Sequence, residues 1–124
     1  MNAAASIVAA LGLFAGGSGL RVTLAAPTHT PKTKVRWPYT VRATRDGSKV
    51  AARLTVQIVD PLGGVNPVKF DRTRKNITNW RFVGVFRDYV IWPAESRGIP
   101  LTFRVTVVAA NAKKVLTYRV TPHA

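Results

Sequence analysis

The sequence contains no cysteine and few residues that can carry acid–base chemistry. Without cysteine the chain can form no disulfide, no thiolate nucleophile and no thiolate metal site. Five Asp and Glu and two His remain among 124 residues, and His29 and His123 lie outside the regular strand pattern described below. We therefore expect no catalytic residue, no metal and no cofactor, in a protein that is not an enzyme and has no small-molecule substrate.

The abundant feature is positive charge. Nineteen Lys and Arg against five Asp and Glu give a formal net charge of +14 at pH 7. Such a chain favours contact with polyanions, which include nucleic acids, anionic lipid surfaces and acidic envelope polymers. The alternative explanation is a solvated surface that resists aggregation and protects strand edges. On the first interpretation, the candidate polyanion-binding residues are Arg36, Arg42, Arg53, Arg72, Arg74, Lys75, Arg104 and Arg119.

The N-terminal segment is typical of an export signal. Residues 3–20 carry no charge and include the apolar stretch Ile7–Ala15, whose length matches the hydrophobic region of a signal peptide. Thr23-Leu24-Ala25 offers a cleavage site, so we predict that residues 1–25 are a signal peptide and that the protein is secreted or extracytoplasmic. The alternatives are an uncleaved membrane anchor through residues 3–20 and a buried helix of the domain.

The rest of the chain divides into a spacer, one domain and a short tail. Residues 26–33 are rich in Pro and Thr, which favour an extended and solvated spacer. Residues 34–121 hold the regular apolar alternation, and 124 residues with 47% hydrophobic content leave room for one such domain. Residues 122–124 form the tail.

The alternation has the period of two that is expected of half-buried strands. Strands are predicted at residues 34–44, 50–58, 66–70, 80–83, 84–92, 101–107 and 113–120. Asp46-Gly47 is predicted to close a hairpin between the first two of them. Because turn signals separate the strands and no convincing amphipathic helix occurs, the predicted fold class is all-β, an antiparallel sandwich of about seven strands.

The strand pattern also resembles that of a known group of modules. The arrangement from Lys49–Val56 through Ile91-Trp92-Pro93 to Gly98–Val105 and Thr117–Thr121 resembles bacterial secreted immunoglobulin-like or fibronectin type III-like modules. The resemblance implies an immunoglobulin-like β-sandwich over residues 34–121 and a role in interaction more than in catalysis. It transfers no binding residue, because the Cys pair of antibody domains is missing here.

Aromatic residues fall into two groups by their place in the alternation. Most lie on predicted apolar faces and are expected in the core. The strand at 84–92 is different, because Arg87 and Tyr89 alternate with Phe86, Asp88 and Val90 and neither side is clearly the inside. A carbohydrate or peptide surface would lie there, and its candidate aromatic residues are Trp80, Tyr89 and Trp92.

Two functional hypotheses follow. The first is a non-enzymatic secreted or cell-envelope module with a structural, adhesive or interaction role, whose partner is an anionic envelope polymer or another protein. The second is a basic nucleic-acid-binding β-domain, which predicts binding that weakens steeply with salt.

Overall fold

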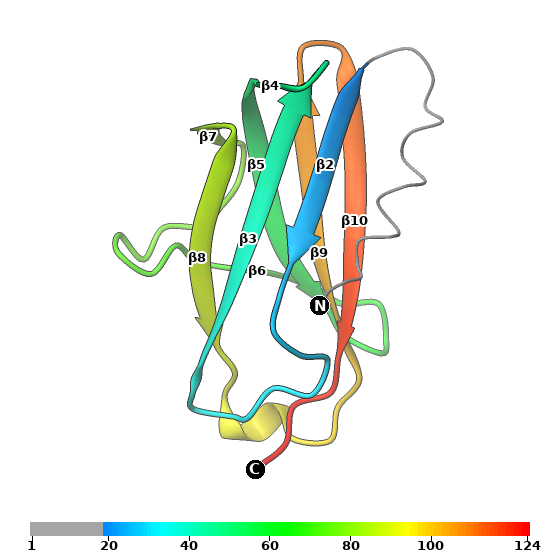
Figure 1. The fold of residues 1–124 in the computed structure, drawn as a ribbon. Coiled ribbons are helices and arrows are strands. Elements are labelled where there is room, and N and C mark those ends of the chain that lie inside the picture. The colour runs from blue at the N-terminus through cyan, green and yellow to red at the C-terminus, as the bar shows by residue number, and fades with distance from the viewer. Residues whose placement is uncertain (1–18) are drawn as a thin grey trace.

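The structure is a computed structural model that describes residues 19–124. It is an all-β sandwich of two antiparallel sheets (Figure 1). The first sheet contains β2 (Leu20–Ala25), β3 (Arg36–Arg45), β4 (Ser48–Lys49) and β8 (Val85–Ile91). The second sheet contains β5 (Ala51–Val59), β6 (Val65–Pro67), β7 (Trp80–Val83), β9 (Leu101–Ala109) and β10 (Ala112–Val120). One 3-10 turn, η1 (Ala94–Ser96), follows β8.

The core lies between the two sheets and is built by the predicted alternation. Apolar side chains at every second position of β3, β5 and β9 are buried, and the side chains between them face outward. The largest buried side chains form what we call the core aromatic cluster. This cluster consists of Trp37, Tyr39, Trp92 and Phe103.

The predicted all-β class with antiparallel sheets is confirmed, and the predicted strands overlap β3 and β5 through β10. The predicted strand at 66–70 is wrong in extent, because only residues 66 and 67 belong to β6. The predicted hairpin is wrong in extent. Asp46 and Gly47 do make a tight turn with φ of 50° and 85°, but only Ser48 and Lys49 pair back onto β3. The chain then crosses to the second sheet as β5, which pairs with β9 on one side and with β6 and β7 on the other.

Gly84 makes a second crossing between the sheets. Its φ of 72° is a conformation that favours glycine, and it allows β7 and β8 to follow each other directly while belonging to different sheets. The Gly84 N–H donates to the Val50 carbonyl, and the Gly84 carbonyl accepts from the Ala43 N–H. As a result β8 lies at an edge of the first sheet, and among residues 19–124 it pairs only with β3.

Strand β2 corrects the predicted start of the domain. Leu20, Val22 and Leu24 are buried in the core, and β2 pairs along its whole length with β3. The sandwich therefore includes Leu20–Ala25, well before residue 34, and cleavage after Ala25 would remove one of its strands. The prediction failed here because the uncharged residues 3–20 overlap the start of the strand and Thr23-Leu24-Ala25 also fits a cleavage site. The predicted signal or anchor in residues 1–18 lies outside the described residues. Among residues 19–124, no helix has the length and hydropathy to cross a membrane.

The predicted spacer and tail are packed against each other and are not a solvated linker and a free end. The His29 ring stacks on Tyr118 with centroids 3.9 Å apart, and its Nδ1–H donates to the Arg119 carbonyl at 2.6 Å. The Thr33 N–H donates to the His123 carbonyl at 2.8 Å, the His123 N–H donates to the Pro31 carbonyl at 2.9 Å, and Trp37 Nε1–H donates to the Thr28 carbonyl at 2.9 Å. His29 is thus stacked on and hydrogen-bonded to β10.

Candidate functional site

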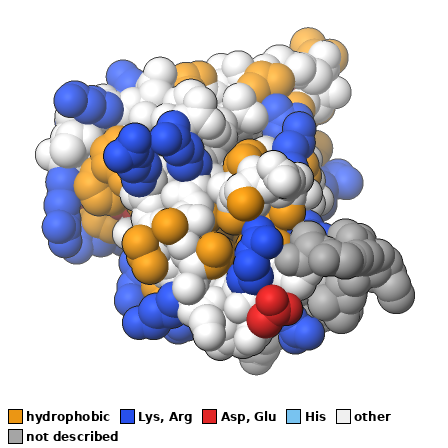
Figure 2. Space-filling model, turned by 90° about the horizontal axis from the view of Figure 1, so that it is seen from above, with side chains coloured by type: hydrophobic (Ala, Val, Ile, Leu, Met, Phe, Trp, Pro, Cys, Tyr) orange, Lys and Arg blue, Asp and Glu red, His pale blue; other side chains and the backbone are white. Residues whose placement is uncertain are grey.

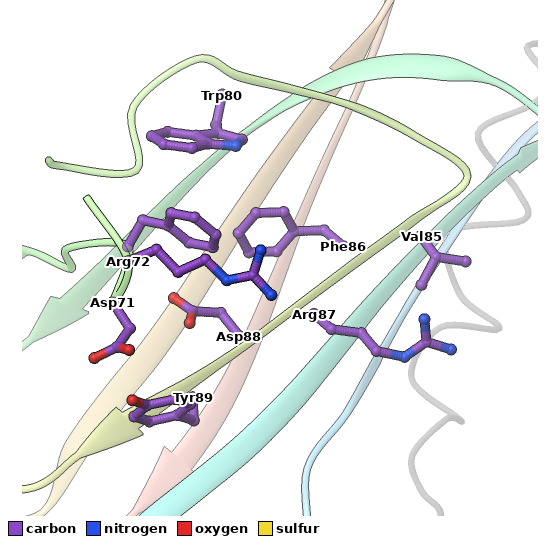
Figure 3. A pocket seen from close by; sticks show the side chains of 9 residues that line it. Asp71, Arg72, Trp80, Val85, Phe86, Arg87, Asp88 and Tyr89 are labelled. Carbon is purple, nitrogen blue, oxygen red and sulfur yellow. The ribbon is translucent and has the colours of Figure 1, made fainter. Parts of the chain in front are cut away.

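Two hollows lie along the edge strand β8. A hollow of about 440 Å³ lies beside the residues from Val85 to Tyr89, and Figure 3 shows the side chains around it. A second hollow of about 230 Å³ lies beside Tyr89 to Ile91. Asp71 and Tyr89 line both hollows, so the two adjoin along the strand. We call the combined surface the β8 trough, with β8 as one wall and residues 67–74 and Trp80 as the other.

The opposite wall is a tight loop that is anchored in the core. The Phe70 N–H donates to the Lys75 carbonyl and the Arg74 N–H donates back to the Phe70 carbonyl, each at 2.8 Å. Arg74 has a φ of 60°, which closes this turn. Ile77 is buried behind the loop, and its carbonyl accepts from the Val56 N–H at 3.0 Å. The loop is therefore held against β5, and its basic side chains project from a fixed backbone.

Aromatic rings form the floor of the first hollow. The Phe70 ring lies 4.9 Å from Trp80 and 5.8 Å from Phe86, measured between centroids. We call Phe70, Trp80 and Phe86 the edge aromatic cluster. Phe86 is buried, whereas Phe70 and Trp80 are half-buried and present part of their rings to the hollow.

Two carboxyl groups lie beside these rings. The Asp88 side chain belongs to the inner side of β8, and its buried Oδ2 has no hydrogen-bond partner among the described residues. Burial is the largest effect on the pKa of Asp88 and raises it above the usual value of 3.8. Backbone N–H groups of Tyr89 and Asp71 and the Arg72 cation oppose this rise, while the Asp71 carboxylate adds to it. The Tyr89 hydroxyl donates to Asp71, and this hydrogen bond raises the pKa of Tyr89.

Cations surround the trough. Arg72 extends toward Asp88 and the Phe86 ring, whereas Arg87 points the other way along β8, past Val85 (Figure 3). The Arg36 guanidinium carbon lies 4.5 Å from the centre of the Tyr89 ring, in a cation–π contact. Lys69 and Arg74 line the second hollow. The trough can therefore offer ring faces, guanidinium donors and carboxylate acceptors to one ligand.

The candidate polyanion-binding residues do not form one site. Figure 2 shows Lys and Arg side chains spread over the face seen from above, with hydrophobic and other side chains between them. Arg36 and Arg42 lie on the outer face of the first sheet, and Arg72, Arg74 and Lys75 lie in the loop beside β8. Arg53, Arg104 and Arg119 project from the outer face of the second sheet. Of these residues, Arg36, Arg72 and Arg74 line or contact the β8 trough.

The candidate aromatic residues are divided in the same way. Trp80 and Tyr89 line the β8 trough. Placing Trp92 on the surface was wrong, because its side chain is 1% exposed and lies edge-on to Trp37 at 5.4 Å. Trp92 takes the next inward position after Phe86, Asp88 and Val90, and its carbonyl accepts from the Lys34 N–H at 2.8 Å.

Asp71, Asp88, Phe70 and Arg87 are the trough residues that sequence reasoning did not single out. A signal for Asp88 was present, because a carboxylate among the apolar positions of β8 left that strand without a clear inside. Nothing local indicated Phe70 and Asp71, because they reach the trough through the fold of the 68–76 loop.

Comparison with known proteins gives a likeness in fold. No protein-family model and no curated protein matches the sequence. The crystal structure of a DUF4426 family protein from Pseudomonas aeruginosa is similar with a TM-score of 0.51 and 18% identity, over 87% of this chain and 96% of that one. A domain of the outer membrane lipoprotein Omp28 from Porphyromonas gingivalis is similar with a TM-score of 0.42 and 10% identity, over 86% of this chain and 99% of that one. The first likeness supports the bacterial β-sandwich fold, and it shows the fold alone.

Proposed function

We propose that this protein is a non-enzymatic, secreted or envelope-associated immunoglobulin-like module that binds an anionic polysaccharide along the β8 trough. The signal-like residues 3–20 support the location. The strand order supports the immunoglobulin-like assignment, because β2, β3 and β8 face β10, β9 and β5 as the two sheets of such domains do.

The observation that carries the proposal is that the two hollows adjoin along one strand. At about 3.3 Å per residue, seven residues of β8 extend roughly 20 Å, a length suited to several units of an extended polymer. Arg72 and Arg87 line the first hollow and Arg74 lines the second, so cations recur along that length. A polymer with repeated negative charges complements this spacing.

The carboxyl groups favour a polysaccharide over a nucleic acid. Asp71 and Asp88 would repel the charges of either polymer, but both can accept hydrogen bonds from the sugar hydroxyls that a polysaccharide carries on every unit. The half-buried faces of Phe70 and Trp80 can pack against the C–H face of a sugar ring. Single-stranded nucleic acid is the second candidate, because Arg and aromatic side chains also bind stacked bases.

The test uses the emission of Trp80. Trp37 and Trp92 are buried and Trp80 is half-buried, so a ligand in the trough should change mainly the Trp80 emission and its quenching by acrylamide. We expect a saturable change with polygalacturonate that weakens with salt and is absent from the Trp80→Phe variant. Neutral dextran should produce no change. A larger response to single-stranded DNA than to polygalacturonate would support the nucleic-acid alternative.

A matched pair of variants assigns the signal to the trough. Arg72→Gln/Arg87→Gln removes two charges from the trough, and Lys32→Gln/Lys34→Gln removes two exposed charges from the segment before β3. The first variant should bind polygalacturonate roughly tenfold more weakly at low salt, and the second should bind within about twofold of the unaltered protein. Equal losses in both variants would mean that general charge, and not the trough, attracts the polymer.

A further inference from the structure

The outer face of the second sheet carries a separate group of cations that the β8 trough does not use. It presents Arg53 from β5, Arg81 from β7, Arg104 from β9, and Lys113 and Arg119 from β10. The other outward positions of these strands hold Thr, Val, Ala and Gln, and the five acidic residues of the chain all lie elsewhere. The face is therefore uniformly positive across four strands.

The register places two of these cations directly opposite each other. Arg53 pairs with Arg81 across β5 and β7, and in the same row Arg53 pairs with Val108, which pairs with Lys113. Like charges at directly opposed positions of a sheet are destabilising. A bound anion would offset the repulsion between Arg53 and Arg81. We therefore expect this pair to attract an anion more strongly than the other positions of the face do.

Arginine is the main cation of this face, and it is suited to recognising anionic groups. Four of its five cations are Arg, whose planar guanidinium matches carboxylate and phosphate oxygens in pairs. Arg104 is held in place, because its Nε and Nη2 donate to the Gln57 Oε1 at 3.3 and 2.8 Å. Solubility alone does not require the guanidinium of Arg104 to be fixed, whereas binding of an anion is favoured by it.

This face points away from the first sheet, while the β8 trough opens at the edge between β8 and β7. Trp80 and Arg81 show the separation, because as neighbours on β7 they point to opposite sides, one into the trough and one onto the face. A polymer chain in the trough would have to turn around the β7 edge to reach Lys113 and Arg119.

We infer that the outer face of the second sheet is a second binding surface for the same class of anionic polysaccharide, so that one domain bridges two chains. The inference rests on the proposed function for the first of its two surfaces. The occupant follows from charge complementarity, since the face offers five cations and no carboxylate.

Different measurements report binding at the β8 trough and at the outer face of the second sheet. Calorimetry with a short oligogalacturonate counts the chains bound per protein, light scattering with long polygalacturonate reports bridging, and Trp80 emission reports the trough. The unaltered protein should bind two oligomers and make the polymer scatter light. Arg53→Gln/Arg81→Gln should keep the Trp80 response, bind one oligomer and lose about nine-tenths of the scattering. Lys32→Gln/Lys34→Gln is the control of equal charge and should behave as the unaltered protein.

Each outcome decides between the claims. A stoichiometry of one with an intact Trp80 response, or scattering that Arg53→Gln/Arg81→Gln leaves unchanged, overturns the bridging inference and leaves the trough in place. A missing Trp80 response overturns the proposed function, and calorimetry then shows whether the second face still binds. Sedimentation of the protein without polymer must give a monomer, because a dimer with one site per copy would scatter without bridging through two faces and would overturn the inference.

Discussion

The two aromatic clusters of this sandwich have similar composition and different surroundings. The core aromatic cluster is closed between the sheets, where the Trp37 ring lies 5.1 Å from Phe103 and 5.4 Å from Trp92. The edge aromatic cluster begins where β8 ends the first sheet, and it is linked to the core by Phe86, 6.2 Å from Tyr39. One cluster is covered by two strand layers and the other by a loop. The comparison indicates that position in the sheet, and not residue type, divides stabilising aromatics from those available for binding.

The largest expected effect comes from uncovering the core. Deletion of residues 1–25 removes β2 and with it Leu20, Val22 and Leu24, whose burial contributes about 4.5–9 kcal/mol in total at roughly 1.5–3 kcal/mol each. Because whole domains have stabilities of only about 5–15 kcal/mol, this deletion should leave the protein largely unfolded. Deletion of residues 1–18 keeps β2 and should fold. Circular dichroism during thermal unfolding compares the two, and equal melting temperatures would show that β2 is dispensable.

The next largest effect is expected from a substitution in the core aromatic cluster. Phe103→Ala leaves a cavity against Trp37 and Tyr39 and should lower the free energy of unfolding by about 3–5 kcal/mol. Urea titration measures this loss, with no change expected in polymer affinity once both proteins are compared in the folded range. A loss below about 1 kcal/mol would mean that the core cluster is not closely packed.

Trp80→Ala tests the edge aromatic cluster and should lower the affinity for the polymer more than it lowers the stability of the fold. A half-buried ring contributes roughly 1 kcal/mol to stability, so urea titration should show a small loss. The affinity for polygalacturonate should fall about tenfold, in line with the roughly 1–3 kcal/mol of a stacking contact. Suppose that Trp80→Ala lowers the free energy of unfolding as much as Phe103→Ala does and leaves binding unchanged. The edge aromatic cluster would then be part of the stabilising core and not a binding surface.

The smallest effect concerns Asp88 and depends on pH. Its pKa is raised in the folded protein, so the native state binds more protons than the unfolded state between 3.8 and the raised pKa, and stability falls as pH rises through that range. Asp88→Asn should therefore melt at a higher temperature than the unaltered protein at pH 7, and the difference should disappear below pH 3.8. A lower melting temperature at pH 7 would mean that the Asp88 carboxylate is stabilised by its neighbours.

The sequence predicted the strands well because their alternation reports burial directly. Val41, Val56 and Val105 are buried as the period of two requires. It did not predict which sheet each strand joins, because Val50 and Gly84 redirect the chain through backbone geometry that the alternation does not record. Strand β2 was missed because its residues were assigned to the end of the signal segment, where Thr23-Leu24-Ala25 fits a cleavage site.

The candidate site was predictable only where it follows the strands. Tyr89 was identified because the strand at 84–92 has no clear inside, Trp80 was grouped with it, and both line the trough. Trp92 was misplaced because Asp88 obscured the alternation of β8, in which Phe86, Val90 and Trp92 all point inward. Phe70 and Asp71 reach the trough through a loop closed by hydrogen bonds across the turn, and these contacts leave no periodic trace in the sequence.

The central claim is that an anionic polysaccharide binds in the β8 trough, and backbone amide chemical shifts during a polygalacturonate titration test it most directly. We expect saturable chemical-shift changes in the amides of residues 69–74 and of β8 from Val85 to Ile91, and these changes should decrease as salt is raised. The amides of the core strand β3 near Ala43 should stay unchanged. If both walls of the trough show no chemical-shift change at polymer concentrations where binding is saturated, the polysaccharide does not bind in the β8 trough.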